Sequence, residues 1–450
     1  MHTCVVRATL QRISPVRMIL LGFALAAWLG TLALMLPVAR RGPGGATFME
    51  ALFTATSAIC VTGLITVDTP SHWTPFGQTV IMVLIQVGGF GVMTLASIIG
   101  YTILHKLSLR ARMTAAAEAR DGGIKEVHQV VLGVLRISLA VESAATLLLA
   151  GRFWLGYGHN PLEALWLGLF HSVSSFNNAG FALFSDSMVS YATDPWICLP
   201  IMASIIIGGL GFPVVAQLLR YFGRPLRWSM NTRLVLFMTA LLLVGGTVFF
   251  TALEWGNPGT LGPYEWHEKL LVGAFQSVQT RTAGFNSIDV GAVHPATLLG
   301  MDVLMFIGGG PAGTAGGIKV TTFAVLFFII WTEIRGEGAV NIFGKRLSRA
   351  VHRQAIAVAL VAVALVLGAT MLLLLLNPYP LAQVQFEVIS AFATVGLSTG
   401  ITAGLEPVSL VVLCALMFLG RVGPVTFAYA LALRSRRRLY ELPKERPIIG

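Results

Sequence analysis

The chain has 450 residues, of which 55% are hydrophobic and only 11% are charged, and its mean hydropathy is +0.77. Soluble globular proteins carry about 25% charged residues, so this composition excludes a soluble enzyme and a disordered or disulfide-stapled secreted chain. The apolar segments are continuous rather than alternating, which excludes an outer-membrane barrel. The composition therefore predicts an all-α polytopic membrane protein.

Eight apolar segments are long enough to cross a hydrocarbon core of ~30 Å, which takes about 20 helical residues. They cover residues 18–36, 76–104, 127–151, 196–219, 234–253, 303–331, 354–376 and 408–433. Most of the 31 basic residues lie in the two terminal segments and in three loops, at 105–126, 220–233 and 333–353. Because positive charge stays on the cytoplasmic side, we expect a multi-pass protein of the cytoplasmic membrane with both termini in the cytoplasm.

The opposite, outer side has few basic residues and is net negative. Its basic residues are Arg40, Arg41, Arg152, Lys269 and Arg281. Its acidic residues include Asp68, Asp186 and Asp289. Carboxylates around an entrance raise the local concentration of cations, although acidic residues that simply avoid the inner side would give the same bias.

Each outer connection contains a short apolar segment, at residues 48–58, 162–173, 266–278 and 384–393. About eleven helical residues cover only ~16 Å, so these segments do not span the membrane. Asn160 and Pro161 are typical of a helix N-cap and first helical position. We expect four re-entrant half-helices, which are tolerated at membrane depth only where protein buries them or they line a water-filled path.

A glycine loop follows each half-helix, and the four glycines Gly63, Gly180, Gly284 and Gly396 are 117, 104 and 112 residues apart. A second glycine motif follows 24 to 28 residues later, at Gly88, Gly208, Gly308 and Gly420. One such motif would indicate only close helix packing, but four pairs at matched spacing predict four pseudo-repeats around a central pore. The predicted repeats are residues 1–105, 106–222, 223–336 and 337–450, the last with a basic C-terminal tail.

The glycine loops predict a cation filter. Rings of backbone carbonyls can replace the hydration shell of an ion, glycine reaches the required backbone conformations at low cost, and the C-terminal ends of the half-helices add partial negative charge. The predicted filter residues are Val61, Thr62, Gly63, Asn178, Ala179, Gly180, Thr282, Ala283, Gly284, Thr394, Val395 and Gly396.

The run at 308–317 predicts a gate below the filter. Its six glycines cost ~1 kcal/mol each in a helix, and its proline ~3 kcal/mol, so a continuous helix is excluded. The predicted gate residues are Gly308, Gly309, Gly310, Gly313, Thr314, Gly316, Gly317, Lys319 and Arg421. Arg421 costs ~2.5–3.5 kcal/mol at a helix centre, so it faces the pore or ties carbonyls together, and Lys319 faces the path or reaches the cytoplasmic interface.

These motifs resemble those of the Trk/Ktr/HKT superfamily of potassium transporters, and most of all the KtrB-type membrane subunit. The resemblance covers nearly the whole chain and is most specific at residues 279–285, at 308–319 and at Arg421. It implies potassium as the transported ion, filter glycines linked to potassium selectivity and a gating loop at 308–317. It also implies a homodimer and a cytosolic ring of RCK-type subunits, so that nucleotide acts only through that partner; sodium activation stays open.

Two functions remain: a gated, passive potassium pore and a sodium- or proton-coupled potassium symporter. A symporter needs an ionisable residue on the path, and the acidic candidates within apolar segments are Glu142 and Glu387. An enzyme is not expected, because the G-x-G-x-x-G match at 308–313 lacks the preceding strand of a dinucleotide site. We expect membrane lipid as a partner, but no nucleic acid and no covalent cofactor.

Overall fold

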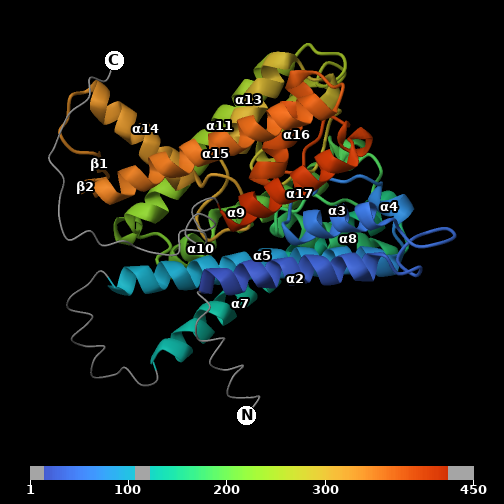
Figure 1. Ribbon diagram of the computed structural model, residues 1–450, viewed down its shortest axis with the longest axis horizontal. Coiled ribbons are helices and arrows are strands. Elements are labelled where there is room, and N and C mark those ends of the chain that lie inside the picture. The colour runs from blue at the N-terminus through green and yellow to red at the C-terminus, as the bar shows by residue number, and fades with distance from the viewer. Residues whose placement is uncertain (1–14, 107–121, 424–450) are drawn as a thin grey trace.

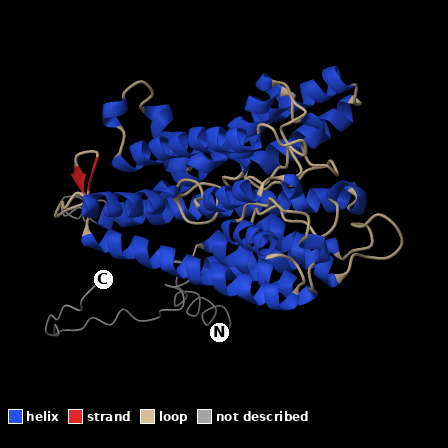
Figure 2. Cartoon of the chain, turned by 90° about the horizontal axis from the view of Figure 1, so that it is seen from above, coloured by secondary structure: helices blue, strands red, loops and turns tan. Residues whose placement is uncertain are grey.

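The computed structural model describes residues 15–106 and 122–423, and these ranges are mostly helical (Figures 1 and 2). The helices are α2 (Pro15–Leu34), α3 (Phe48–Ile59), α4 (Thr69–His72), α5 (Pro75–Lys106), α7 (Gly122–Tyr157), α8 (Pro161–Phe176), α9 (Pro195–Leu210), α10 (Phe212–Arg220), α11 (Met230–Glu254), α12 (Trp266–Gln279), α13 (Pro295–Phe306), α14 (Val320–Ile334), α15 (Arg349–Leu376), α16 (Leu381–Ala393) and α17 (Pro407–Val422). Strands β1 (Asn341–Ile342) and β2 (Lys345–Arg346) form an antiparallel hairpin between α14 and α15. The predicted basic tail and most of the loop at 105–126 lie outside the described residues.

Four of the described helices are long and apolar enough to cross a membrane on their own. They contain the segments Pro75–Thr94, Gln129–Tyr157, Met230–Glu254 and Arg349–Leu376. The helices at 20–34, 295–306, 320–334 and 407–422 are apolar but shorter, with 10–17 residues each. The structure therefore confirms the helical membrane class, while the count of eight spans stays a prediction.

The segment at 196–219 differs from the single span expected from the sequence. It forms two helices, α9 and α10, which are bent by 100° relative to each other. The break lies at Gly211, whose φ of 90° is left-handed and ends the helical path. A Cβ at Gly211 would strike the carbonyl oxygen of Pro311. Pro311 belongs to residues 308–317, which we call the gating run, so the backbone of this run approaches α9 closely at this point.

Four short helices, α3, α8, α12 and α16, occupy the positions predicted for the half-helices. α3 begins with a capping box, in which the Thr47 hydroxyl accepts from the Glu50 amide and the Glu50 carboxylate accepts from the Thr47 amide. α8 begins as the sequence predicts, with Asn160 as N-cap and Pro161 at the first position. These caps satisfy amides that have no partner within the helix, so each helix starts at a defined residue.

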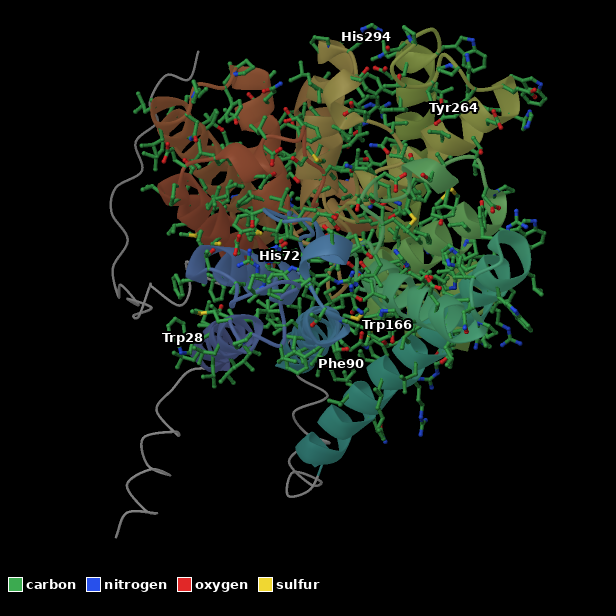
Figure 3. The ribbon with its side chains drawn as sticks, turned by 90° about the vertical axis from the view of Figure 1, so that its right-hand side faces the viewer. Trp28, His72, Phe90, Trp166, Tyr264 and His294 are labelled. Atoms are coloured by element: carbon green, nitrogen blue, oxygen red, sulfur yellow. The ribbon has the colours of Figure 1, made fainter. Side chains whose placement is uncertain are left out.

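The short helices connect consecutive quarters of the chain into a closed circle. α8 packs against α5, α12 against α9, α16 against α13, and α3 against α17. Figure 3 shows this arrangement end on, with the blue, green, yellow and red quarters of the chain around a common centre. A circle that closes between the first and last quarters places the loops after the short helices near one axis.

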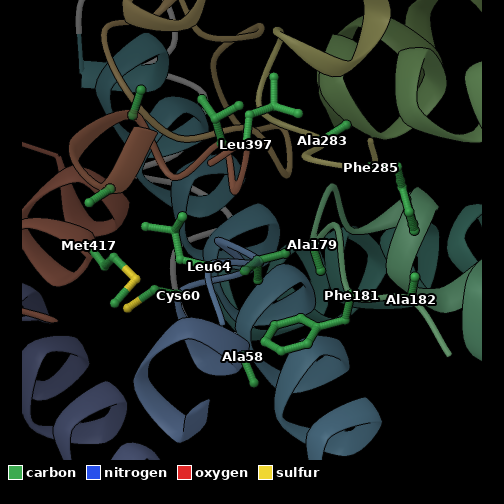
Figure 4. Packing of buried hydrophobic residues seen from close by; sticks show 14 of the residues in the cluster. Ala58, Cys60, Leu64, Ala179, Phe181, Ala182, Ala283, Phe285, Leu397 and Met417 are labelled. Atoms are coloured by element: carbon green, nitrogen blue, oxygen red, sulfur yellow. The ribbon is translucent and has the colours of Figure 1, made fainter. Parts of the chain in front are cut away.

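The residues after the four loop glycines pack into the hydrophobic core. Leu64, Phe181, Phe285 and Leu397 are all buried there (Figure 4). The long helices instead expose apolar side chains on their outer faces, for example Val248 on α11 and Leu375 on α15. An apolar exterior is expected where lipid rather than water surrounds the protein.

Candidate functional site

The four loop glycines lie against one another in a closed ring. A Cβ placed at Gly63 would lie 3.1 Å from the Cα atom of Gly180, and one at Gly180 would lie 3.0 Å from that of Gly284. A Cβ at Gly284 would lie 3.1 Å from the Cα atom of Gly396, and one at Gly396 would lie 3.1 Å from that of Gly63. We call these four residues the glycine ring. Gly63 and Gly396 are 333 residues apart in sequence, so only the circular packing of the helices brings them together.

Backbone carbonyls fill the space between neighbouring ring members. The oxygen that a Cβ would meet first belongs to Ala179 at Gly63, Ala283 at Gly180, Val395 at Gly284 and Thr62 at Gly396. All four glycines have left-handed φ angles, of 90°, 69°, 78° and 94° in chain order. Any side chain at these positions would therefore both strain the backbone and displace a carbonyl of the adjacent loop.

The loops also contain a strained residue two positions before each glycine. Val61, Asn178, Thr282 and Thr394 have φ angles of 56°, 58°, 70° and 51°. A left-handed conformation costs a non-glycine residue roughly 1–2 kcal/mol, and it recurs at the same position in all four loops. Strain of this kind persists only where the surroundings fix it, and it is concentrated at functional sites.

The amides of the loops bond to the short helices. The Gly63 amide donates to Ser57 Oγ at 3.0 Å, and the Gly396 amide donates to Ser390 Oγ at 3.1 Å. Because buried amides need acceptors, this arrangement satisfies them away from the ring and leaves the loop carbonyls available.

The other two loops satisfy their amides in related ways. In the second, the Ala179 amide donates to the Ser174 carbonyl at 2.7 Å. In the third, Gln279 replaces serine: its carbonyl accepts from the Ala283 amide at 3.1 Å and its side-chain oxygen accepts from the Phe285 amide at 3.0 Å. These acceptors were not predicted from the sequence, although a serine stands six residues before three of the four glycines.

An open cavity of about 280 Å³ lies on one side of the ring, and all four ring glycines line it. Its wall also contains Asp68, Asp186 and Asp289, three of the carboxylates that the sequence places on the outer side. Carboxylates that converge on a cavity attract cations. The structure therefore brings these carboxylates together beside the ring, while their position on the outer side stays a prediction.

The gating run lies directly against the ring from another side. A Cβ at Gly316 would strike the Thr394 hydroxyl, and the Thr314 hydroxyl lies 3.2 Å from the side-chain amide of Asn178. The segment between α13 and α14 is non-helical, as its glycine content predicts, and its residues 312–318 are buried. The structure thus brings the predicted filter and gate residues into contact.

Backbone hydrogen bonds hold the gating run to the end of α9. The Gly310 amide donates to the Gly209 carbonyl at 2.8 Å, and the Thr314 amide donates to the Gly208 carbonyl at 3.1 Å. The run also bonds to itself, because the Gly308 amide donates to the Ile318 carbonyl at 2.8 Å. These are bonds between separate segments, unlike those within a helix.

Arg421 is buried and joins two carbonyls. Its guanidinium donates to the Thr314 carbonyl of the gating run and, at 3.1 Å, to the Gly88 carbonyl of α5. Lys319 donates to the Ala315 carbonyl within the run, so it turns toward the run and not toward the cytoplasmic interface. Both side chains thus contact carbonyl groups of the gating run, and their position beside an ion path stays a prediction.

The comparisons with known proteins agree with this geometry. Residues 34–437 match the family model described as TrkH, cation transport protein. The chain belongs to the TrkH family. This is a family of cation transport proteins and not of enzymes.

Full-length relatives and a solved structure extend this result. The chain is 39% identical to Ktr system potassium uptake protein B of Vibrio alginolyticus, over 96% of the chain and 94% of the relative. It is 38% identical to Ktr system potassium uptake protein B of Bacillus subtilis (strain 168), over 94% of each, and 34% identical to potassium/sodium uptake protein NtpJ of Enterococcus hirae, over 98% of each. The crystal structure of the potassium transporter TrkH from Vibrio parahaemolyticus matches with a TM-score of 0.69 at 18% identity, over 94% of this chain and 84% of that one.

Arg281 is a second buried arginine at the gating run of this TrkH-family chain. Its place in the sequence predicted an outer loop, whereas the structure buries it, with Nη2 3.5 Å from the Gly308 carbonyl and Nη1 3.4 Å from the Thr239 carbonyl. A small cavity of about 20 Å³ adjoins it. Counting charges by loop fails here because Arg281 directly follows the short helix α12 and is buried inside the protein.

Glu142, one of the two carboxylates considered for ion coupling, is held in a polar cluster. It accepts from Ser138 Oγ at 2.9 Å, from Gln86 Nε2 at 3.2 Å and from Asn177 Nδ2 at 3.3 Å. Asn177 caps the C-terminal end of α8. Glu142 therefore braces the helix that precedes the second loop and does not line the cavity above the ring.

Proposed function

We propose that the chain is the potassium-translocating subunit of a Ktr-type uptake system and that potassium passes through the glycine ring. The single observation that carries this proposal is the ring itself, with a carbonyl between each pair of neighbouring glycines. Carbonyl oxygens can replace the water around an alkali ion. The C-terminal ends of the four short helices point toward the loops and add negative potential.

In this proposal the molecule has eight spans and four pore helices in four pseudo-repeats. Four of the spans are built from interrupted or short helices, and both termini lie in the cytoplasm. Interrupted helices are tolerated at membrane depth where they are buried in protein or line a path. The filter is formed by the four loops, each of which contributes its glycine and the two residues before it.

The gating run acts as a plug in the path below the filter. It lies against Asn178 and Thr394 and is tied by Arg421 and Lys319. A fixed guanidinium beside the path also opposes the passage of cations. Opening requires the run to leave α9 and the start of α10, which breaks three inter-segment amide bonds, including that from the Phe212 amide to the Ala312 carbonyl, but no helix.

A cytosolic partner controls this plug. Two of the relatives are named as parts of Ktr systems, which supports a regulatory subunit of the RCK type that binds nucleotide, together with a homodimeric membrane part. The described part of the expected docking loops includes the β1–β2 hairpin and a cavity of about 210 Å³ lined by Glu337, Arg346, Arg349 and His352. Polar and charged walls of this kind suit a protein partner in water.

Passive uptake is favoured over coupling to another ion. The membrane potential supplies ~2.3 kcal/mol per charge per 100 mV, and neither Glu142 nor Glu387 lines the cavity above the ring. The name of the Enterococcus hirae relative, a potassium/sodium uptake protein, keeps sodium-coupled or sodium-activated uptake as the second candidate.

Flux measurements in proteoliposomes test this proposal. With imposed potassium, sodium and proton gradients, we expect rubidium uptake that follows the rubidium gradient and the membrane potential alone. Rubidium accumulation against its gradient, driven by sodium at zero potential, would instead establish the symporter.

A further inference from the structure

The four proposed pore helices, α3, α8, α12 and α16, share a sequence feature that the glycine motifs do not reveal. Each contains a buried phenylalanine, namely Phe53, Phe170, Phe275 and Phe386. The residue after this phenylalanine differs in every helix: it is Thr54, His171, Gln276 or Glu387, and all four side chains are at most 1% exposed. Thr54, His171 and Glu387 lie nine residues before their loop glycines and Gln276 lies eight before Gly284, so the four can be compared through the phenylalanine that precedes each.

Glu387 of α16 binds the segment that leaves the ring after Gly396. Its carboxylate accepts from the Thr399 amide at 3.0 Å, from the Thr402 hydroxyl at 2.8 Å and from the Ser398 hydroxyl. Ser398 lines the cavity above the ring. No basic side chain in the described ranges lies within ion-pair distance of Glu387, so hydrogen bonds alone stabilise this fully buried carboxylate.

His171 of α8 makes the corresponding contact in the second loop. Its Nε2 accepts from the Leu183 amide at 3.1 Å, and its Nδ1 lies 2.7 Å from the Leu167 carbonyl. The imidazole of His171 must therefore carry its proton on Nδ1, which leaves Nε2 as an acceptor. Leu183 lies three residues after Gly180, as Thr399 lies three residues after Gly396.

The third loop repeats the contact more weakly, and the first lacks it. Gln276 Oε1 accepts from the hydroxyl of Ser287, three residues after Gly284, at 3.3 Å. In the first loop, the hydroxyls of Thr54 and of Thr66, three residues after Gly63, are both buried without a partner among the described residues. One helix position thus holds the loop exit in three repeats and leaves it untied in the fourth.

We propose that Glu387, His171 and Gln276 are positioning residues that fix the outer exit of the filter and thereby set its discrimination between potassium and sodium. This inference rests on the proposed function of the glycine ring as a cation filter. A site that must reject a smaller ion needs ligands held in place by a supporting layer of hydrogen bonds. Glu387 contributes most, because hydrogen bonds to a charged group are stronger than neutral ones and its charge adds to the potential at the exit.

The substitution Glu387→Gln tests this directly, because it keeps the size of the side chain but removes the charge and one acceptor. We expect the rubidium-to-sodium uptake ratio in proteoliposomes to fall by about tenfold or more, the size expected for losing one hydrogen bond to a charged group. The matched control is Thr54→Val, at the same helix position in the first repeat, where the hydroxyl has no partner. It should leave the ratio unchanged.

Substitutions at His171 separate positioning from folding. His171→Leu removes the acceptor for the Leu183 amide and should lower the ratio, whereas His171→Gln supplies an amide oxygen and should restore it at least in part. The rubidium-to-sodium uptake ratio should be lower for His171→Leu than for His171→Gln even when both variants purify as monodisperse protein with unchanged yield. If Glu387→Gln and His171→Leu both keep the ratio of Thr54→Val, the inference is wrong. If the unmodified protein itself shows no rubidium preference, the proposed filter fails instead.

Discussion

The glycine ring and the gating run are both rich in glycine, yet they use it for different purposes. In the ring every glycine has a left-handed φ and a carbonyl where its side chain would stand. In the gating run, among Gly308, Gly309, Gly310, Gly313, Gly316 and Gly317, only Gly317 has a positive φ. The ring needs glycine for its backbone geometry, whereas the run needs it mainly for close approach.

The two regions also differ in what holds them. The ring loops bond their amides to the ends of the short helices α3, α8, α12 and α16, a few residues away in sequence. The gating run bonds to α9 and to Arg421, which are distant in sequence. Local bonds to a capped helix favour a rigid element, and bonds between separate segments favour one that can detach.

The substitution Gly396→Ala should disrupt the ring most severely. Its Cβ would strike the Thr62 carbonyl at a φ of 94°, so both the strain and the lost carbonyl position act against ion binding. We expect rubidium uptake in proteoliposomes to fall by about a hundredfold or more, since the two penalties combine. Gly400→Ala is the control, because Gly400 has a φ of 92° but no atom within 4 Å of its added Cβ.

If both alanine variants lose uptake equally, backbone strain alone explains the loss. The ring would then have no special need for close carbonyls. If neither variant changes uptake, ions do not pass through the ring.

Arg421→Gln should release the gating run. The guanidinium makes two hydrogen bonds that link the run to α5, and bonds to a charged group contribute about 1.5–3 kcal/mol each. We therefore expect the basal rubidium leak, measured in proteoliposomes that contain the membrane subunit alone, to rise about tenfold. Arg136→Gln, which changes an exposed arginine of α7, should leave the leak as it is, and equal leaks in the two variants would remove Arg421 from the gate.

Arg281→Gln should also raise the basal rubidium leak, but by less than Arg421→Gln. Its contacts to the Gly308 and Thr239 carbonyls are long, at 3.5 and 3.4 Å, and hydrogen bonds weaken at such distances. We expect a leak about threefold above that of the unmodified protein. A leak larger than that of Arg421→Gln would show that the run is hinged at Gly308 and not held at Thr314.

Gly313→Ala should give the smallest change. Its Cβ would lie 2.8 Å from the Gly209 carbonyl and 3.0 Å from the Gly208 carbonyl, which pushes the run slightly away from α9 without altering a charge. We expect the leak to rise about twofold, as for the weakening of one neutral hydrogen bond. A lower leak would mean that the added methyl group fills space and tightens the plug.

The sequence predicted much of this arrangement because its signals are local or periodic. The start of α8 follows from Asn160 and Pro161, and the break at 308–317 follows from the helix propensity of glycine. The four loops are visible because glycine is needed at the same place in each. Residue types that are required for backbone reasons leave a pattern that a single sequence can show.

The remaining features depend on contacts between segments distant in the chain. The bend at Gly211 needs the approach of Pro311, and the burial of Arg281 needs the fold that places it against Gly308. The position shared by His171, Gln276 and Glu387 uses three different residue types, so no repeat in the sequence reveals it. Such features follow from the tertiary structure and not from propensity.

The proposed ion path requires the four ring glycines to surround one ion-binding axis. A structure of the full chain determined in rubidium, with its anomalous signal, tests this most directly. We expect rubidium density at the centre of Gly63, Gly180, Gly284 and Gly396, next to the carbonyls of Thr62 and Ala283. Rubidium bound only among the carboxylates of Asp68, Asp186 and Asp289 in the cavity beside the ring, with none inside the ring at saturating concentration, would contradict this.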